Sequence, residues 1–170
     1  MAKEKIAILT WVNDDNYGTC LQAYALNRKI RDFGYDAVTI NYKAKDISRV
    51  LKILKLLFNP LFTIKKIYRF YIKKERNRTL VYENQLERHK RFVDFRNQYI
   101  PLSDIYIDDD FNDVEKRYDN FIVGSDQIWN TIRINHIYYL DFIHESLKKN
   151  SYAPSFGSEF IKNIILLNEL

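Results

Sequence analysis

The chain has 170 residues, enough for one domain with its own core and too few for two large ones. An apolar content of 46% and a charged content of 29% exclude a disordered chain, and Cys20, as the only cysteine, excludes an intrachain disulfide or a cysteine metal cluster. The net charge of +5 is unevenly distributed: residues 43–78 carry +10, and the rest of the chain carries −5.

The N-terminus has only about seven consecutive apolar residues before polar ones begin. This is shorter than the apolar region of most signal peptides and far below the ~20 residues of a membrane span. A single cysteine is also usual in a reducing compartment. We therefore expect a cytoplasmic protein.

The first forty residues predict a strand, a helix and a second strand. Residues 4–11 form a continuous apolar run that ends at a polar cluster. Residues 19–34 have apolar side chains near helical spacing, with Thr19 able to cap the start and Gly34 suited to the end. Residues 36–42 read as the second strand. Such βαβ units imply a parallel sheet covered by helices.

The middle of the chain predicts helices. Residues 46–60 and 61–78 read as two basic amphipathic helices separated at Asn59-Pro60, and residues 80–99 as a third, more conventional helix. The apolar faces of the two basic helices, within residues 47–76, suit either packing on the sheet or contact with anionic lipid at the inner face of the membrane.

The α/β pattern resumes after Pro101. We expect a short helix near 112–117, strands at 119–125 and 148–155, and a final apolar helix over 158–170. The prediction is a single α/β domain over 1–170, a Rossmann-like parallel sheet with helices on both faces and a helical insertion at about 46–98.

Three polar stretches follow predicted strands: "NDDNYGTCLQ" (13–22), "GSDQIWN" (124–130) and "SYAPSFGS" (151–158). Parallel sheets bind ligands beyond the carboxyl ends of their strands, so the three stretches predict one shared crevice. Each alone also fits a turn. Asn16 and Gly18 could hold an anion or a sugar oxygen, or shape the turn, with a positive φ at Gly18 and Thr19 as the cap. Ser125 or Asp126 could cap a helix while Trp129 packs on the sheet.

Other sites have little support. The histidines His89, His136 and His144 lack metal-ligand spacing, and Asp108-Asp109-Asp110 reads as a solvated turn, so we expect no metal site. No GxGxxG, Walker or CxxC motif is present, and we expect no cofactor.

Read together, "NYGTCLQAYAL", "GSDQIWN" and "SYAPSFG" resemble the polysaccharide pyruvyl transferase family, over roughly residues 6–157. The resemblance implies transfer of a pyruvyl group from phosphoenolpyruvate to two hydroxyls of a sugar, giving a cyclic ketal in bacterial surface glycans. It also implies a fold similar to the N-terminal half of a GT-B glycosyltransferase.

The resemblance further implies site residues. Asp126 becomes the candidate general base. The implied substrate-binding residues are Asn16, Gly18, Gln22, Gly124, Ser125, Gln127, Trp129, Asn130, Ser155, Phe156 and Gly157. Family members are usually about twice as long, with the donor-binding cations in the second half, so we expect an incomplete half that is inactive alone.

The implied partners are phosphoenolpyruvate and a glycan acceptor, lipid-linked acceptors included. The missing half or a second copy would cover the apolar last helix. One alternative is a non-catalytic module that binds a glycan or a protein partner. Another is a nucleic-acid binder, which the basic segment motivates but no recognised motif supports.

Overall fold

In the computed structural model of the chain, residues 2–44, 80–130 and 135–157 are described. The two basic helices predicted over 46–78 and the final helix over 158–170 lie outside these residues. The chain divides into two compact units, Met1–Lys43 with Phe92–Leu170, and Ala44–Arg91. The sheet and the three polar stretches belong to the first unit.

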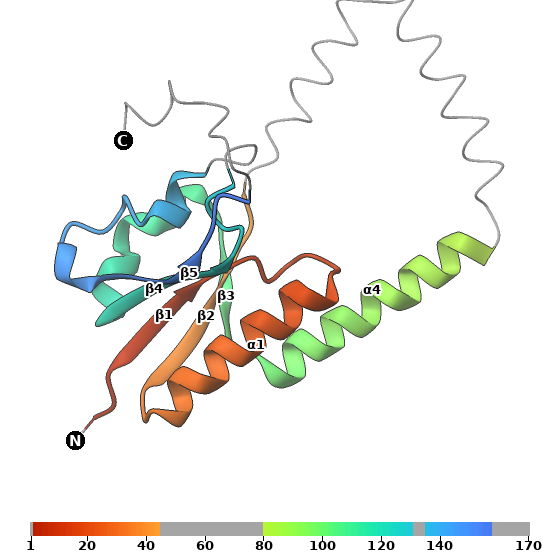
Figure 1. Ribbon diagram of the computed structural model, residues 1–170, viewed down its shortest axis with the longest axis horizontal. Helices are drawn as coiled ribbons and strands as arrows, with labels where there is room; N and C mark the ends of the chain where they lie inside the picture. The colour runs from red at the N-terminus through yellow and green to blue at the C-terminus, as the bar shows by residue number, and fades with distance from the viewer. Residues whose placement is uncertain (1, 45–79, 131–134, 158–170) are drawn as a thin grey trace, which may run out of the picture. The chain divides into compact units, whose positions relative to one another are not determined.

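The first unit is built on a five-stranded sheet in which every pairing is parallel. The strand order is β3-β2-β1-β4-β5 (Figure 1), which confirms the predicted Rossmann-like α/β class. The strands are β1 (Lys5–Leu9), β2 (Asp36–Tyr42), β3 (Leu102–Tyr106), β4 (Asn120–Asp126) and β5 (Lys149–Pro154).

Helix α1 (Tyr17–Asp32) follows β1 as predicted, but its cap differs from the prediction. Asn16, not Thr19, is the N-cap: its side-chain Oδ1 accepts a hydrogen bond of 3.2 Å from the Thr19 backbone N–H. Gly18 lies in the first helical turn and does not have a positive φ. Gly34, two residues after the helix, has a φ of +100°, as expected at a helix end.

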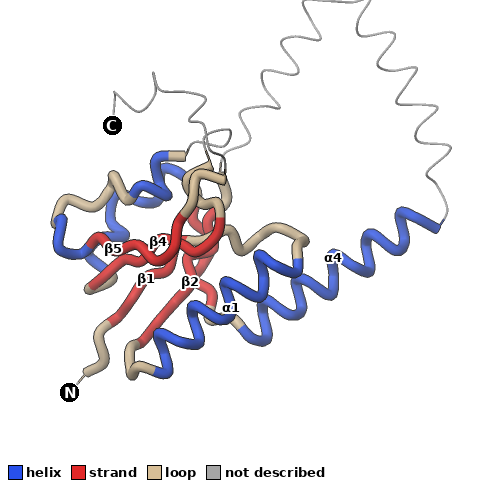
Figure 2. Tube along the Cα trace, in the orientation of Figure 1, coloured by secondary structure: helices blue, strands red, loops and turns tan. Residues whose placement is uncertain are grey.

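One face of the sheet packs against α1. Alternate residues of β1, Ile6 and Ile8, are buried there with Leu26 and Ile30 of the helix. Helix α4 (Leu80–Tyr99) matches the predicted bounds, and its last turns add aromatic contacts to α1 through Phe95. Figure 2 shows α1, in blue, lying along the red strands.

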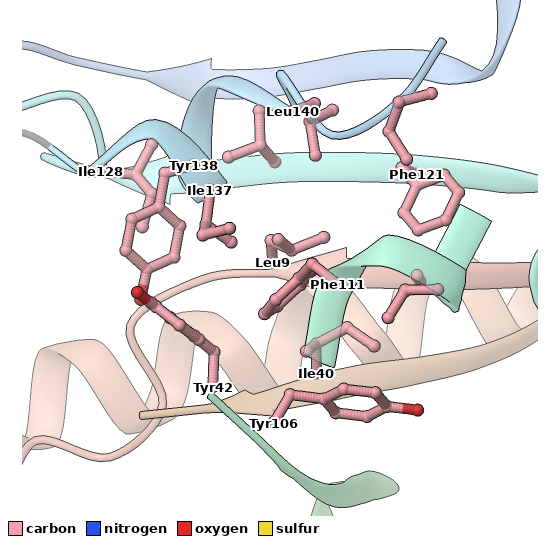
Figure 3. Close-up of a cluster of buried hydrophobic side chains, with 14 residues drawn as sticks. Leu9, Ile40, Tyr42, Tyr106, Phe111, Phe121, Ile128, Ile137, Tyr138 and Leu140 are labelled. Carbon is pink, nitrogen blue, oxygen red and sulfur yellow. The ribbon is translucent and has the colours of Figure 1, made fainter. Parts of the chain in front are cut away.

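The opposite face of the sheet carries the larger core. Ala7 and Leu9 of β1 point into it, with Phe121 of β4 fully buried (Figure 3). Two 3₁₀ helices bury side chains against this face, η1 (Asp108–Arg117) and η2 (His136–Tyr139). A third, η3 (Ser146–Lys148), precedes β5 and has no buried residue. The sheet therefore has helical elements on both faces, and η1 replaces the short helix predicted near 112–117 with a longer 3₁₀ segment.

Strand β3 was not among the predicted elements. Its sequence, Leu-Ser-Asp-Ile-Tyr, follows Pro101 and reads as a loop, because polar residues interrupt a short apolar pattern. It pairs only with β2 and lies at the edge of the sheet, where a strand does not need a strict alternation of apolar and polar residues. No helix in the described part of the chain is long and apolar enough to cross a membrane.

Candidate functional site

The strand order creates a switch point beside β1. From β1 the chain passes through α1 to β2 on one side, and later returns to place β4 on the other side of β1. In open parallel sheets, the crevice beyond the carboxyl ends of the strands at such a switch point is the usual place for a ligand. All three polar stretches begin at or near this edge.

A chain of side-chain hydrogen bonds joins β1, α1 and β4 at the switch point. The Ser125 hydroxyl donates to Oε1 of Gln22 over 2.7 Å, and Nε2 of Gln22 donates to the buried hydroxyl of Thr10 over 2.7 Å. Gln22, from the first stretch, is thereby fixed to Ser125 in the second. Both were predicted site residues, whereas Thr10 was not.

Gly124 brings β4 and β5 closer together than any side chain would permit. A Cβ atom at this position would lie 2.0 Å from the carbonyl oxygen of Tyr152, and its φ is +126°. The peptide bond from Gly124 to Ser125 is cis. Glycine is therefore required here by two independent constraints, space and backbone conformation.

Backbone hydrogen bonds tie the second stretch to the third. The Ser155 N–H donates to the Asp126 carbonyl over 3.0 Å, and the Trp129 N–H donates to the Ser155 carbonyl over 3.2 Å. Gly157 lies against Gln127, so closely that a Cβ atom there would be 2.4 Å from Gln127 Oε1. Residues 124–130 and 155–157 consequently form one continuous wall.

Asp126 ends β4 in an uncommon conformation, with a φ of +84°. One carboxylate oxygen, Oδ1, accepts a 2.8 Å hydrogen bond from the Gln127 backbone N–H. The following residues form a turn, closed by the Asn130 N–H donating to the Gln127 carbonyl over 3.0 Å. Asp126 thus caps no helix in the described residues, and its half-buried carboxylate lies at the edge of the sheet.

The Trp129 side chain packs against the core and against η2. Its indole N–H donates to the Tyr138 carbonyl over 3.0 Å, and its ring stacks on Tyr139 with 6.0 Å between centroids and 7° between planes. Phe156 of the third stretch tilts against the same indole at 5.9 Å. Trp129 therefore packs on the core that covers the sheet, as one of the two readings of the sequence predicted. Together with Tyr139 and Phe156 it forms an aromatic cluster.

Burial raises the pKa of the Tyr139 hydroxyl within this cluster, because desolvation disfavours the charged phenolate. Its hydroxyl oxygen has no hydrogen-bond partner among the described residues. No spacing signal in the sequence pointed to Tyr139, because it belongs to a 3₁₀ segment that only the tertiary structure brings against Trp129.

The loop before α1 is held by a buried cation. Arg96 of α4 is 5% exposed, and its Nη1 donates to the Asp14 carbonyl over 3.3 Å and lies 3.6 Å from Asp15 Oδ1. Asn16 follows directly, with its side chain engaged as the helix cap. Among the first-stretch residues, Gln22 is the one joined to the second stretch by a described hydrogen bond.

The three stretches carry one sign of charge. They contain Asp14, Asp15 and Asp126 and no Lys, Arg or His. Within the described residues, no group of three or more metal-ligating side chains is present. The wall therefore offers carboxylate, amide, hydroxyl and aromatic groups, which suit a neutral polyhydroxyl ligand better than an anionic one.

Comparison with known proteins places the chain in a family. A family model described as polysaccharide pyruvyl transferase matches residues 16–167. Neither the curated proteins nor the solved structures that were searched gave a significant match. The matched range includes the first-stretch cap Asn16, the wall at 124–130 and the strand β5 that supports it. The chain belongs to the polysaccharide pyruvyl transferase family.

Proposed function

We propose that this chain takes part in transferring a pyruvyl group from phosphoenolpyruvate to two hydroxyls of a glycan, and that the wall formed by 124–130 and 155–157 receives the glycan. The observation that carries the proposal is the Asp126 carboxylate at the switch point, on a wall that has no cation of its own. A carboxylate at this position is suited to accept a proton from a sugar hydroxyl.

The proposed reaction converts phosphoenolpyruvate and two sugar hydroxyls into a cyclic ketal and free phosphate. The two acceptor oxygens each form a bond to the C2 carbon of phosphoenolpyruvate, and the bond from C2 to the phosphate oxygen breaks. One hydroxyl proton ends on the methylene carbon, which becomes a methyl group, and the other leaves with the phosphate. Asp126 would remove the first hydroxyl proton, while the donor's phosphate and carboxylate require cations that the three stretches do not supply.

The acceptor would be held by amide and aromatic groups. Asn130 and Gln127 are joined by a 3.3 Å hydrogen bond between Nδ2 and Oε1, which orients both amides on the wall. Trp129 and Phe156 add apolar ring surface of the kind that stacks on sugar faces. Asn16 is a weaker candidate contact, since its side chain already caps α1.

The experiment that tests this function is complementation. Deleting the gene from its source organism should remove pyruvate ketals from the surface glycan, measured by the ketal methyl signal in NMR spectra. The intact gene should restore the signal, and Asp126→Asn should lower the rate of ketal formation by about 100-fold or more, the usual effect of losing a general base.

Asp113→Asn is the matched control, because Asp113 is an exposed carboxylate on η1 that pairs with Lys116 over 2.6 Å, away from the wall. It should restore ketals like the intact gene. An unchanged ketal signal in the deletion strain would refute the proposed function. Full activity of Asp126→Asn would refute only the assignment of Asp126 as the general base and would leave the proposed function standing.

A further inference from the structure

An open apolar groove runs beside α1 on the face of the sheet that α1 covers. It has a volume of about 940 Å³, and its lining includes Leu26 of α1, Ile6 of β1, Ile122 of β4 and Tyr152 of β5. The groove extends along the strands, and at their carboxyl ends it reaches Gln22 and Ser125, where it meets the wall.

The groove marks a face of the sheet that the described residues leave incomplete. In β4, Phe121 and Val123 are buried on one side at 0% and 2% exposure, whereas Ile122, on the α1 side, is only partly buried. In β5, Tyr152 is 60% exposed. All-parallel sheets normally have both faces covered, so a further element is expected over β4 and β5.

We propose that residues 158–170 of the same chain occupy this groove. They begin directly after Gly157, three residues beyond the end of β5 at Pro154. Gly157 has a φ of +68°, a conformation that suits a reversal of the chain. The segment has apolar residues at helical spacing, namely Phe160, Ile161, Ile164, Ile165 and Leu167.

The dimensions of the segment and of the groove agree. Thirteen helical residues would span ~20 Å at 1.5 Å per residue. The six residues of β5 span ~20 Å at about 3.3 Å per residue. A helix returning antiparallel to β5 would therefore cover the whole strip between β5 and α1 without further chain. This inference does not depend on the proposed chemistry.

Disulfide trapping in the full chain tests the proposal. Ala25 lines the groove, so Ala25→Cys is combined in separate variants with Ile161→Cys or with Ile165→Cys. Each pair is made twice, once with Cys20→Ser and once with the buried Cys20 retained. We expect oxidation to give an intramolecular disulfide in at least one of these variants. A disulfide-linked dimer would assign the groove to a second copy, and the absence of any cross-link would leave the segment elsewhere; either result overturns the proposal.

Two controls make the trapping specific. Asp113→Cys, on η1 against the opposite face of the sheet, should form no cross-link with the same partners. As an independent readout, the double variant Ile161→Asp and Ile165→Asp should increase the fluorescence of a dye that binds exposed apolar surface several-fold, whereas Lys162→Asp should not. Equal fluorescence of the two variants would contradict the proposal.

Discussion

At the scale of single residues, Gly124 allows the sharpest stability prediction. Gly124→Ala should destabilise the fold by roughly 3 kcal/mol or more, because the new Cβ would overlap the Tyr152 carbonyl oxygen at 2.0 Å and must also adopt a positive φ. Gly34→Ala is the matched control: its φ is +100°, but no atom lies within 4 Å, so only the conformational cost of ~1–2 kcal/mol remains. Urea unfolding of both variants measures the difference, and equal losses would contradict the steric argument.

Glu115 makes stability depend on pH. Its carboxylate accepts hydrogen bonds from the Glu145 backbone N–H, from the His144 side chain and from the His144 backbone N–H, which together lower its pKa to about 2. The ordinary pKa, 4.5, is higher, so the unfolded chain binds the proton more readily. The contribution is present above pH 4.5 and is lost as the pH falls towards 2.

Glu115→Gln should therefore reduce the free energy of unfolding at neutral pH and leave it nearly unchanged at pH 2. Glu145→Gln provides the control, since the exposed pair of Glu145 with Lys148 contributes little. Chemical unfolding at several pH values measures both variants. An identical pH dependence in wild type and Glu115→Gln would show that these hydrogen bonds do not stabilise the fold.

Single residues also show the limit of sequence reasoning. The polar groups at the end of β4 could be predicted from the sequence, because polar residues after an apolar run indicate a strand end. The close approach of Gly124 to Tyr152 could not, because the two residues lie on neighbouring strands and are distant in sequence. The cap at Asn16 was assigned to Thr19 instead, since both residue types cap helices and only the backbone geometry decides between them. Thr10 and Tyr139 gave no signal because their roles come from partners distant in sequence.

At the scale of elements, α1 and the β4 loop should be energetically coupled through Gln22. Ser125→Ala and Gln22→Ala each remove the 2.7 Å hydrogen bond between the two side chains, so a double-mutant cycle should give a coupling energy of about 1 kcal/mol. The pair Ser125→Ala and Asp113→Asn, which share no partner, should be additive. Additivity of the first pair would mean that the hydrogen bond contributes nothing to stability.

The elements that could be predicted are those with an internal signal. β1, β2, α1 and α4 have long periodic or continuous apolar patterns, and the structure confirms them. β3 lacked such a pattern, since an edge strand paired on one side need not be apolar. The predicted single domain with an insertion at about 46–98, the membrane contact of 47–76 and the GT-B likeness stay predictions.

At the scale of the whole molecule, we expect the purified chain to release no phosphate from phosphoenolpyruvate above background, with any glycan acceptor. The physical reason is electrostatic, because the donor is a polyanion and the three stretches at the switch point contain three carboxylates and no cation. A phosphate-release assay with and without acceptor measures this. Acceptor-dependent release would show that cations elsewhere in this chain complete the site.

The position of β1 in the centre of the sheet has a consequence for synthesis of the protein. β1 pairs with β4 in the register Ile6 to Asn120, so its partner emerges from the ribosome 114 residues later. At 5–20 residues per second, this edge of an apolar strand remains open for roughly 6 to 23 s. An unpaired apolar edge is a template for aggregation. Recovery of folded protein should therefore depend on chaperone supply while the chain is being made.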